Sequence, residues 1–207
     1  MKITKIINKI AQENTYLLSN SSTIIVIDPG SDSDEILEKI HQIDLPVSAI
    51  LLTHAHFDHI MGISAIQSEF PDVKIYVHEA EKFWLSNSEL NAGQFFLRQN
   101  ITAPNATNFY EFDKTYHLTG FEFQVRQTPG HSPGGVSLVF NHEKIVFTGD
   151  ALFNNSIGRT DLTDGNLETL QNAIKTQLFT LPNDYDVFPG HGNSTTIGAE
   201  KMYNPFL

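Results

Sequence analysis

The sequence predicts an α/β fold in which two β-sheets pack face to face and helices cover their outer faces. Two observations support this prediction: short apolar runs typical of buried strands, and longer segments in which apolar residues recur every three or four positions. Their order is strands, helix, strand, helix, and then strands, helix, strand. Because each sheet then has one face to cover, this order indicates a four-layer αββα sandwich. We expect residues 1–207 to form a single domain.

In the first half, residues 1–27 are rich in β-branched and apolar side chains and predict strands that end at the turn Asp28–Gly30. Beyond this turn, the spacing of apolar residues alternates between that of helices and that of buried strands. The pattern predicts a helix over 31–43, a strand over 47–52, a helix over 59–70, a strand over 73–78 and helical structure over 79–108.

The second half also combines apolar runs with segments of helical spacing, but it does not repeat the sequence of the first half. Residues 121–125 alternate apolar and polar side chains, which indicates a half-buried strand. The runs 134–140 and 144–150 predict two antiparallel strands joined by a tight turn. A helix is expected over 166–179, and 185–192 predicts a last short strand.

Composition narrows the range of partners and compartments. The formal net charge is −11, from 24 acidic and 13 basic residues, so phosphate backbones and anionic lipid are repelled. We therefore expect neither nucleic acid nor a membrane as partner. The sequence has no cysteine, which excludes disulfides, thiolate ligands and cysteine nucleophiles and fits a reducing compartment. With no signal-peptide pattern and no apolar run of membrane-spanning length, a cytoplasmic protein is expected.

Three histidines and one aspartate lie within six residues, after a predicted buried strand. If the chain stays extended there, His54 and His56 point the same way and can bind one metal ion. Asp58 and His59 lie where the chain turns into a helix, so they point towards a second ion close to the first. Imidazole and carboxylate ligands suit zinc, iron or manganese. A cluster of this kind without a metal would place polar groups at a costly position.

Four ligands do not complete two coordination shells, so further ligands must come from later in the chain. The second half offers His131, Asp150 and His191, each at a predicted strand end beside a glycine that allows a tight turn. The remaining histidines occur singly, and we interpret them as surface or structural residues: His41, His78, His117 and His142.

Together these motifs resemble the metallo-β-lactamase superfamily. "HAHFDH" matches its His-x-His-x-Asp-His signature, and "PGHSPG", "TGDALF" and "PGHG" match its later ligand motifs in order and spacing. The resemblance implies the αββα fold and two divalent metal ions, zinc first, with iron or manganese as alternatives. It implies the following ligands: His54, His56 and His131 for the first metal, Asp58, His59 and His191 for the second, and Asp150 as the bridge. Asp58 and Asp150 would position a metal-bridging hydroxide for catalysis.

Within the superfamily, the chain looks most like short, single-domain bacterial relatives of glyoxalase II, the hydroxyacylglutathione hydrolases. "TGDALFNNSIGRTD" resembles the corresponding segment of that group. True class B β-lactamases typically use a cysteine near the bridging position, where this chain has Asp150. The resemblance therefore implies a hydrolase that cleaves a small-molecule thioester to an acid and a thiol. The glutathione-binding tyrosines of glyoxalase II have no counterpart here, so the thiol carrier stays open.

Arg159, Asp161 and Asn193 replace the glutathione-binding positions, and we expect them to face the substrate. The alternative for Arg159 is an ion pair with Asp161 that ties its own loop. One alternative function is a persulfide dioxygenase-like enzyme with a single iron, but intact His59 and His191 favour two metals. A non-catalytic metal-binding module is the other alternative, and the oligomeric state is left open.

Overall fold

The computed structural model of the protein describes residues 1–112 and 114–207. In these residues it contains two six-stranded sheets, a two-stranded hairpin and helices, which confirms the predicted α/β class with two sheets. The chain divides into two compact units, one formed by Met1–Tyr110 with His117–Phe121 and the other by Glu111–Tyr116 with Glu122–Leu207. The single-domain organisation stays a prediction.

The sheet of the first unit has the strand order β1-β2-β3-β4-β5-β6. Its strands are β1 (Lys2–Ile7), β2 (Asn14–Ser19), β3 (Ile24–Ile27), β4 (Val47–Leu51), β5 (Lys74–Val77) and β6 (Asn108–Phe109). The first three strands pair antiparallel, whereas β3 to β6 run parallel. Because the carboxyl ends of parallel neighbours meet at one sheet edge, the residues that follow β3 and β4 lie together.

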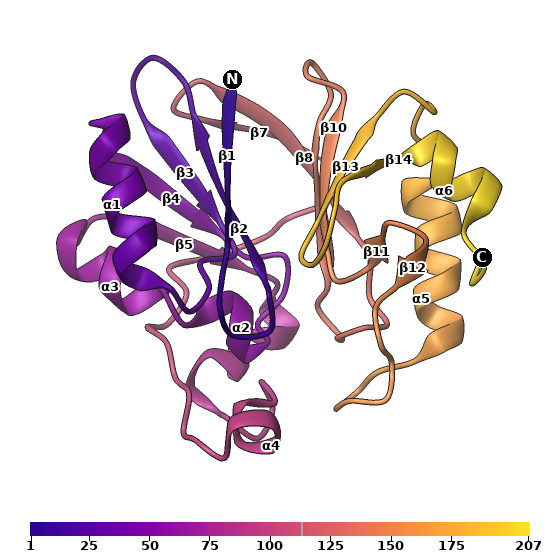
Figure 1. Ribbon diagram of the computed structural model, residues 1–207, viewed down its shortest axis with the longest axis horizontal. Helices are drawn as coiled ribbons and strands as arrows, with labels where there is room; N and C mark the ends of the chain where they lie inside the picture. Colours follow the sequence, from indigo (N-terminus) through magenta and orange to yellow (C-terminus); the bar gives the residue numbers. More distant parts are fainter. Residues whose placement is uncertain (113) are drawn as a thin grey trace. The chain divides into compact units, whose positions relative to one another are not determined.

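Three helices of this unit are α1 (Ser33–Ile43), α2 (Phe57–Ile60) and α3 (Ile63–Glu69). Figure 1 shows α1 and α3 beside each other against the same face of the sheet. Their apolar stripes are fully buried there with the side chains of the strands, and the residues are Ile36, Ile40, Ile63 and Ile66. Removing this apolar surface from water is the main term that holds the helices in place.

The predicted helix over 59–70 is two helices, broken at Met61 and Gly62. The Gly62 N–H donates to the carbonyl of Pro29 at 2.9 Å. A side chain at Gly62 would place its Cβ 2.8 Å from the carbonyl oxygen of Gly30. The close approach of this turn to the chain after β3 therefore sets the break, which helical periodicity cannot reveal.

The prediction of helical structure over 79–108 is wrong. The segment contains only short pieces: turns of 3₁₀-helix at Glu79–Glu81 and Trp84–Ser86, α4 (Gly93–Leu97), and β6 at its end. Ala92 and Arg98 adopt left-handed backbone conformations with φ of 65° and 54°, which end any continuous helix. Tertiary contacts at these positions outweigh the helix-forming composition.

The sheet of the second unit has the strand order β14-β13-β10-β9-β8-β7, and β11 pairs with β12 in a separate hairpin. The strands are β7 (Thr115–Leu118), β8 (Phe121–Gln127), β9 (Val136–Phe140), β10 (Ile145–Gly149), β11 (Leu152–Phe153), β12 (Ser156–Ile157), β13 (Asp186–Pro189) and β14 (Thr195–Thr196). The predicted antiparallel pair is confirmed as β9 and β10. In contrast, β10 and β13 are parallel, so the residues that follow them share one edge.

The predicted helix over 166–179 is confirmed as α5 (Leu167–Ala173) followed by a π-helical turn at Ile174–Leu178. A further helix, α6 (Ile197–Tyr203), was not predicted, and Figure 1 shows it beside α5. The apolar face of α5 is buried with strands β10 and β13. No helix in the described part of the chain is both long enough and apolar enough to cross a membrane.

Candidate metal centre

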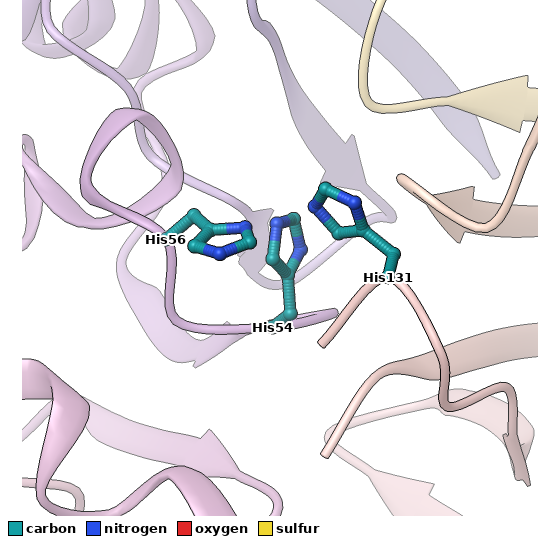
Figure 2. A group of neighbouring side chains, drawn as sticks. All are labelled: His54, His56 and His131. Carbon is teal, nitrogen blue, oxygen red and sulfur yellow. The ribbon is translucent and has the colours of Figure 1, made fainter. Parts of the chain in front are cut away.

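The histidine cluster of the first unit lies at the end of β4 and in α2. The rings of His54 and His56 meet edge to face with centroids 4.8 Å apart, and the rings of His54 and His59 are 4.1 Å apart. The Asp58 carboxylate lies 4.0 Å from Nε2 of His59. All four side chains are buried. Figure 2 shows the imidazoles of His54 and His56 beside each other on their loop; it also labels His131, which belongs to the second unit.

Asp28, which directly follows β3, holds the start of this loop. Its carboxylate accepts the Thr53 N–H at 2.7 Å and the Thr53 hydroxyl at 2.6 Å. The Thr53 oxygen also lies 3.1 Å from Nδ1 of His54. Because the Thr53 hydroxyl donates its proton to the hydrogen bond with Asp28, its oxygen accepts a hydrogen bond from Nδ1–H of His54. The Nε2 atom of His54 is then the nitrogen left to bind a metal.

The same carboxylate supports His59. Its Oδ2 atom lies 3.1 Å from Nδ1 of His59, and Oε1 of Glu13 lies 3.8 Å from that nitrogen. Glu13 is itself held by hydrogen bonds from Asn8 at 2.7 Å and Thr15 at 3.2 Å. Carboxylates on the far nitrogen of a metal-binding histidine fix its ring and raise its basicity. His59 is therefore oriented with Nε2 towards Asp58.

The donors of the second unit lie after three strands of its sheet. The Oδ2 atom of Asp150 is 3.5 Å from Nε2 of His131 and 3.3 Å from Nε2 of His191. The parallel pairing of β10 and β13 continues as a 2.8 Å hydrogen bond from Gly190 N–H to the Gly149 carbonyl, which places Asp150 beside His191. One carboxylate thus faces the Nε2 atoms of two imidazoles.

His131 is oriented by a main-chain contact. Its Nδ1 atom donates to the carbonyl oxygen of Arg159 at 2.7 Å, which leaves Nε2 directed at Asp150. Gly158 lies close to both His131 and Asp150. A Cβ at Gly158 would lie 1.8 Å from the main-chain oxygen of Asp150 and 3.1 Å from Nδ1 of His131. Only glycine leaves room for the chain to pass this close to both donors.

The residues expected to face the substrate lie in exposed loops of the second unit. Arg159 donates two hydrogen bonds to Asp161, from Nε at 2.7 Å and from Nη2 at 2.8 Å. The expected alternative, an ion pair within the loop, is therefore present. These hydrogen bonds lower the pKa of Asp161 to about 2 and raise that of Arg159. Asn193 is exposed in the loop before β14. A role of these three residues in substrate binding stays a prediction.

The donor set fits divalent metal ions. Buried imidazoles whose rings lie 4–5 Å apart gain little from each other, whereas a cation satisfies several nitrogens and carboxylate oxygens at once. The second unit repeats this chemistry with Asp150 between two imidazoles. Neutral nitrogen and anionic oxygen ligands are those that zinc, iron and manganese accept.

Three supporting carboxylates were missed by the sequence analysis: Glu13, Asp28 and Glu81, all buried. Asp28 carries a usable signal, since a charged residue directly after a continuous apolar strand lies at the sheet edge where sites form. Glu13 and Glu81 carry none, because each is an acidic residue in a polar segment, where a surface position is the ordinary expectation. Their burial follows from tertiary contacts alone.

The sequence matches the metallo-beta-lactamase superfamily over residues 9–191. A probable metallo-hydrolase of Streptococcus pyogenes is 50% identical over 210 residues, which cover 100% of this chain and 90% of the relative. The hydroxyacylglutathione hydrolase GloC of Haemophilus influenzae is 36% identical over 199 residues, which cover 95% of this chain and 93% of the relative.

Solved structures agree with this match. The crystal structure of BLEG-1 B3 metallo-beta-lactamase is 38% identical, with a TM-score of 0.95 over 100% of this chain and 99% of that one. TTHA1623 in a di-iron-bound form is 34% identical, with a TM-score of 0.84 over 99% and 100% of the two chains. ETHE1 from Myxococcus xanthus is 27% identical, with a TM-score of 0.79 over 99% and 84%.

Proposed function

The chain belongs to the metallo-beta-lactamase superfamily, and from this premise we propose that it is a binuclear metal-dependent hydrolase that cleaves a thioester to an acid and a thiol. The observation that carries the proposal is the Asp150 carboxylate, 3.5 Å from His131 and 3.3 Å from His191. A carboxylate between two imidazoles is what a bridging ligand requires. The 36% identical hydroxyacylglutathione hydrolase supports the choice of a thioester.

We assign seven ligands to the proposed centre. The motifs of the superfamily imply that a first ion would take His54, His56 and His131, that a second would take Asp58, His59 and His191, and that Asp150 would be shared by both. Zinc is the proposed metal, because imidazole and carboxylate are the protein ligands of many catalytic zinc sites. Iron and manganese accept the same donors, and a 34% identical neighbour was crystallised in a di-iron-bound form, so the metal content of the purified protein decides between them.

When bound, divalent ions at this site would lower the pKa of a water to near 7 and so supply a nucleophile at neutral pH. The residues of this chain hold and direct that water. Asp58 and Asp150 are the two carboxylates among the proposed ligands, and a carboxylate can accept a hydrogen bond from that water. Asp28 and Arg159 contribute indirectly, since they fix the rings of His54 and His131 through hydrogen bonds.

A thioester suits such a site because its leaving thiolate has a conjugate acid with a pKa near 8.5, so departure needs little protonation. An amide leaving group needs a general acid, and the proposed ligand set contains none beyond the metal-binding groups. A polyanionic substrate is disfavoured by the net charge of −11. We therefore propose a small-molecule thioester as substrate and a cytoplasmic setting.

The test is a panel of thioesters, including S-lactoylglutathione and esters of other thiol carriers, applied to protein of measured metal content. We expect two metal ions per chain and hydrolysis of at least one thioester. The His56→Ala variant is expected to lose metal and activity together. Normal turnover by that variant, or a metal-loaded protein that cleaves no thioester, would contradict the proposal.

The same panel separates the alternatives. A β-lactam is included because the 38% identical neighbour is a B3 metallo-beta-lactamase. A dioxygenase-like function predicts one iron per chain and consumption of oxygen with a persulfide substrate. A non-catalytic module predicts metal binding with no turnover of any of these compounds.

A further inference from the structure

Glu81 is fully buried although it carries a carboxylate, and it ends the short 3₁₀-helix after β5. Its Oε2 atom accepts the main-chain N–H of Ala55 at 2.6 Å. Ala55 lies between His54 and His56 in the chain. We propose that Glu81 is a positioning residue of the metal centre, which sets the directions of both histidines through the peptide between them. The inference rests on the proposed metal binding.

The hydrogen bond from Ala55 to Glu81 acts directly on the main chain between the two histidines. The N–H of Ala55 belongs to the peptide group that joins it to His54, and the Cα of Ala55 joins that group to the peptide of His56. A peptide group is planar, so holding its N–H in one direction removes the main rotation by which the loop would redirect the two imidazoles. Ala55 is itself fully buried, so the loop has no space in which to swing.

Two more contacts come from the same segment, residues 79–103. The ring of Trp84 lies 5.4 Å from the ring of His56, and the Phe57 N–H donates to the carbonyl of Asn91 at 2.9 Å. Asn91 is fixed in turn, since its amide donates to the carbonyls of Trp84 at 2.9 Å and Ile101 at 3.0 Å. The segment thus contacts the loop with a carboxylate, a ring and a carbonyl.

These contacts explain why the segment is irregular. In a continuous helix the carbonyl of Asn91 would accept a hydrogen bond within the helix and would not be available to Phe57. The left-handed conformation of Ala92, with φ of 65°, turns the chain directly after Asn91. The departure from the predicted helix therefore has a consequence at the candidate site.

The charge of Glu81 acts in the same direction as its hydrogen bond. Burying an ionised carboxylate costs free energy unless an opposite charge lies nearby. A cation bound by His54 and His56 would lie near the peptide that Glu81 binds, so an ionised carboxylate there would favour the metal-loaded loop. Glutamine at this position keeps the shape and one accepting oxygen but removes the charge, whereas alanine removes both.

The experiment compares Glu81→Gln and Glu81→Ala with the wild type and with Ile36→Ala. Ile36 is fully buried in α1 of the same unit, so its variant reports general core destabilisation. Zinc affinity is measured by competition with a chromophoric chelator, and ligand geometry by the visible spectrum of the cobalt(II)-substituted protein. Neither measurement needs a substrate.

We expect Glu81→Ala to weaken zinc binding about 10–100-fold and to change the cobalt spectrum, as removal of a group that orients metal ligands does. Glu81→Gln is expected to show a smaller loss, and Ile36→Ala a lower melting temperature with wild-type affinity and spectrum. If Glu81→Ala does not fold, Glu81→Gln carries the test against the same control.

Wild-type affinity and spectrum in the Glu81 variants would overturn the inference. Losses no larger than those of Ile36→Ala would overturn it as well, because they would show a merely structural role. A wild type that binds metal but cleaves no thioester contradicts the proposed activity and leaves the role of Glu81 intact. A wild type that binds no metal contradicts the proposed centre itself, and the inference with it.

Discussion

His131 donates its Nδ1–H to the carbonyl oxygen of Arg159, with 2.7 Å between the two atoms. Arg159 therefore acts on the candidate centre through its main chain, while its guanidinium is bound to Asp161. The sequence directs attention to the charged side chain of Arg159. The structure shows that the atom nearest the proposed ligands is one that any residue at this position would have.

The first prediction concerns Gly158, which lies against Asp150 and His131. Gly158→Ala adds a methyl group whose position lies 1.8 Å from the main-chain oxygen of Asp150, so the backbone must shift and both Asp150 and His131 move. We expect a loss of about 1–3 kcal/mol in the free energy of unfolding, as for other overpacked sites, and weaker metal binding. Urea unfolding of the metal-free protein and a zinc titration measure the two effects. Ser156→Ala, in the same hairpin, is the control, and equal behaviour of the two variants would contradict the steric argument.

The second prediction concerns Asp28. Asp28→Asn keeps the size and suits the positive φ of 47°, but it cannot accept hydrogen bonds at both oxygens. Thr53 or His59 then loses its partner, so we expect the free energy of unfolding to fall by about 1–3 kcal/mol and metal at the His59 site to be lost first. Urea unfolding and metal analysis after dialysis measure this. Exposed Asp34→Asn is the control, and two tightly held metal ions in Asp28→Asn would exclude the supporting role.

The third prediction tests Arg159 as a substrate-binding residue. If a substrate carboxylate competes with Asp161 for the guanidinium, Arg159→Gln raises KM about tenfold with little change in kcat. Asp161→Asn releases the guanidinium and is expected to lower KM. Steady-state kinetics with a carboxylate-bearing thioester measure both values. A change of KM in the same direction in both variants would show that the pair only ties its loop.

The fourth prediction concerns pH and His78. Burial lowers the pKa of His78 below its usual value of 6.5, against an opposing effect of Glu79. The folded protein then binds fewer protons here than the unfolded chain, so this contribution to stability is full above pH 6.5 and is lost as the pH falls towards the lowered pKa. The Nδ1 atom of His78 also accepts the Ala80 N–H at 3.0 Å, at the start of the turn that carries Glu81.

His78→Asn keeps an accepting atom at this position without a titrating group. We expect its free energy of unfolding to fall less steeply than that of the wild type between pH 7.5 and about pH 5. Urea unfolding at several pH values measures the two slopes, and all other titrating groups are common to both proteins. Parallel profiles would show that His78 does not contribute.

The fifth prediction concerns metal removal. A chelator is expected to abolish hydrolysis and to lower the melting temperature, because ions that bind only the folded state stabilise it by about 2.7 kcal/mol when present at a hundred times their dissociation constant. Zinc should restore both properties. The His56→Ala variant provides the comparison, and a chelator effect of equal size in that variant would place its action elsewhere.

The predicted ligands of the first unit were accessible from sequence because they lie within six residues of one another, directly after an apolar run. His54, His56, Asp58 and His59 are brought together by local geometry, and the structure places them as neighbours. The residues that hold these ligands in place could not be identified from the sequence. Asp28 reaches Thr53 and Glu81 reaches Ala55 only through pairing and packing between distant parts of the chain.

Two errors of the fold prediction have different causes. The segment 79–108 has helix-forming composition, but the contacts of Asn91 and the left-handed residues Ala92 and Arg98 divide it. The two-residue strand β14 is too short to have a readable pattern, and the helix after it begins where Thr196 caps Ala199. Tertiary contacts outweigh local preference in the first case, whereas the second depends on a short strand and a local cap that apolar periodicity does not reveal.

The parallel pairing of β10 and β13 also determines how the protein folds. The donors His54 to His59 are close in the chain, so little loop entropy is lost when they come together. Asp150 meets His191 only after the chain has closed the crossover that contains α5, a non-local contact of the kind that slows folding. We therefore expect the first unit's donors to assemble early during refolding and Asp150 to meet His191 late. A metal ion present from the start of refolding would then bind first to His54 and His56.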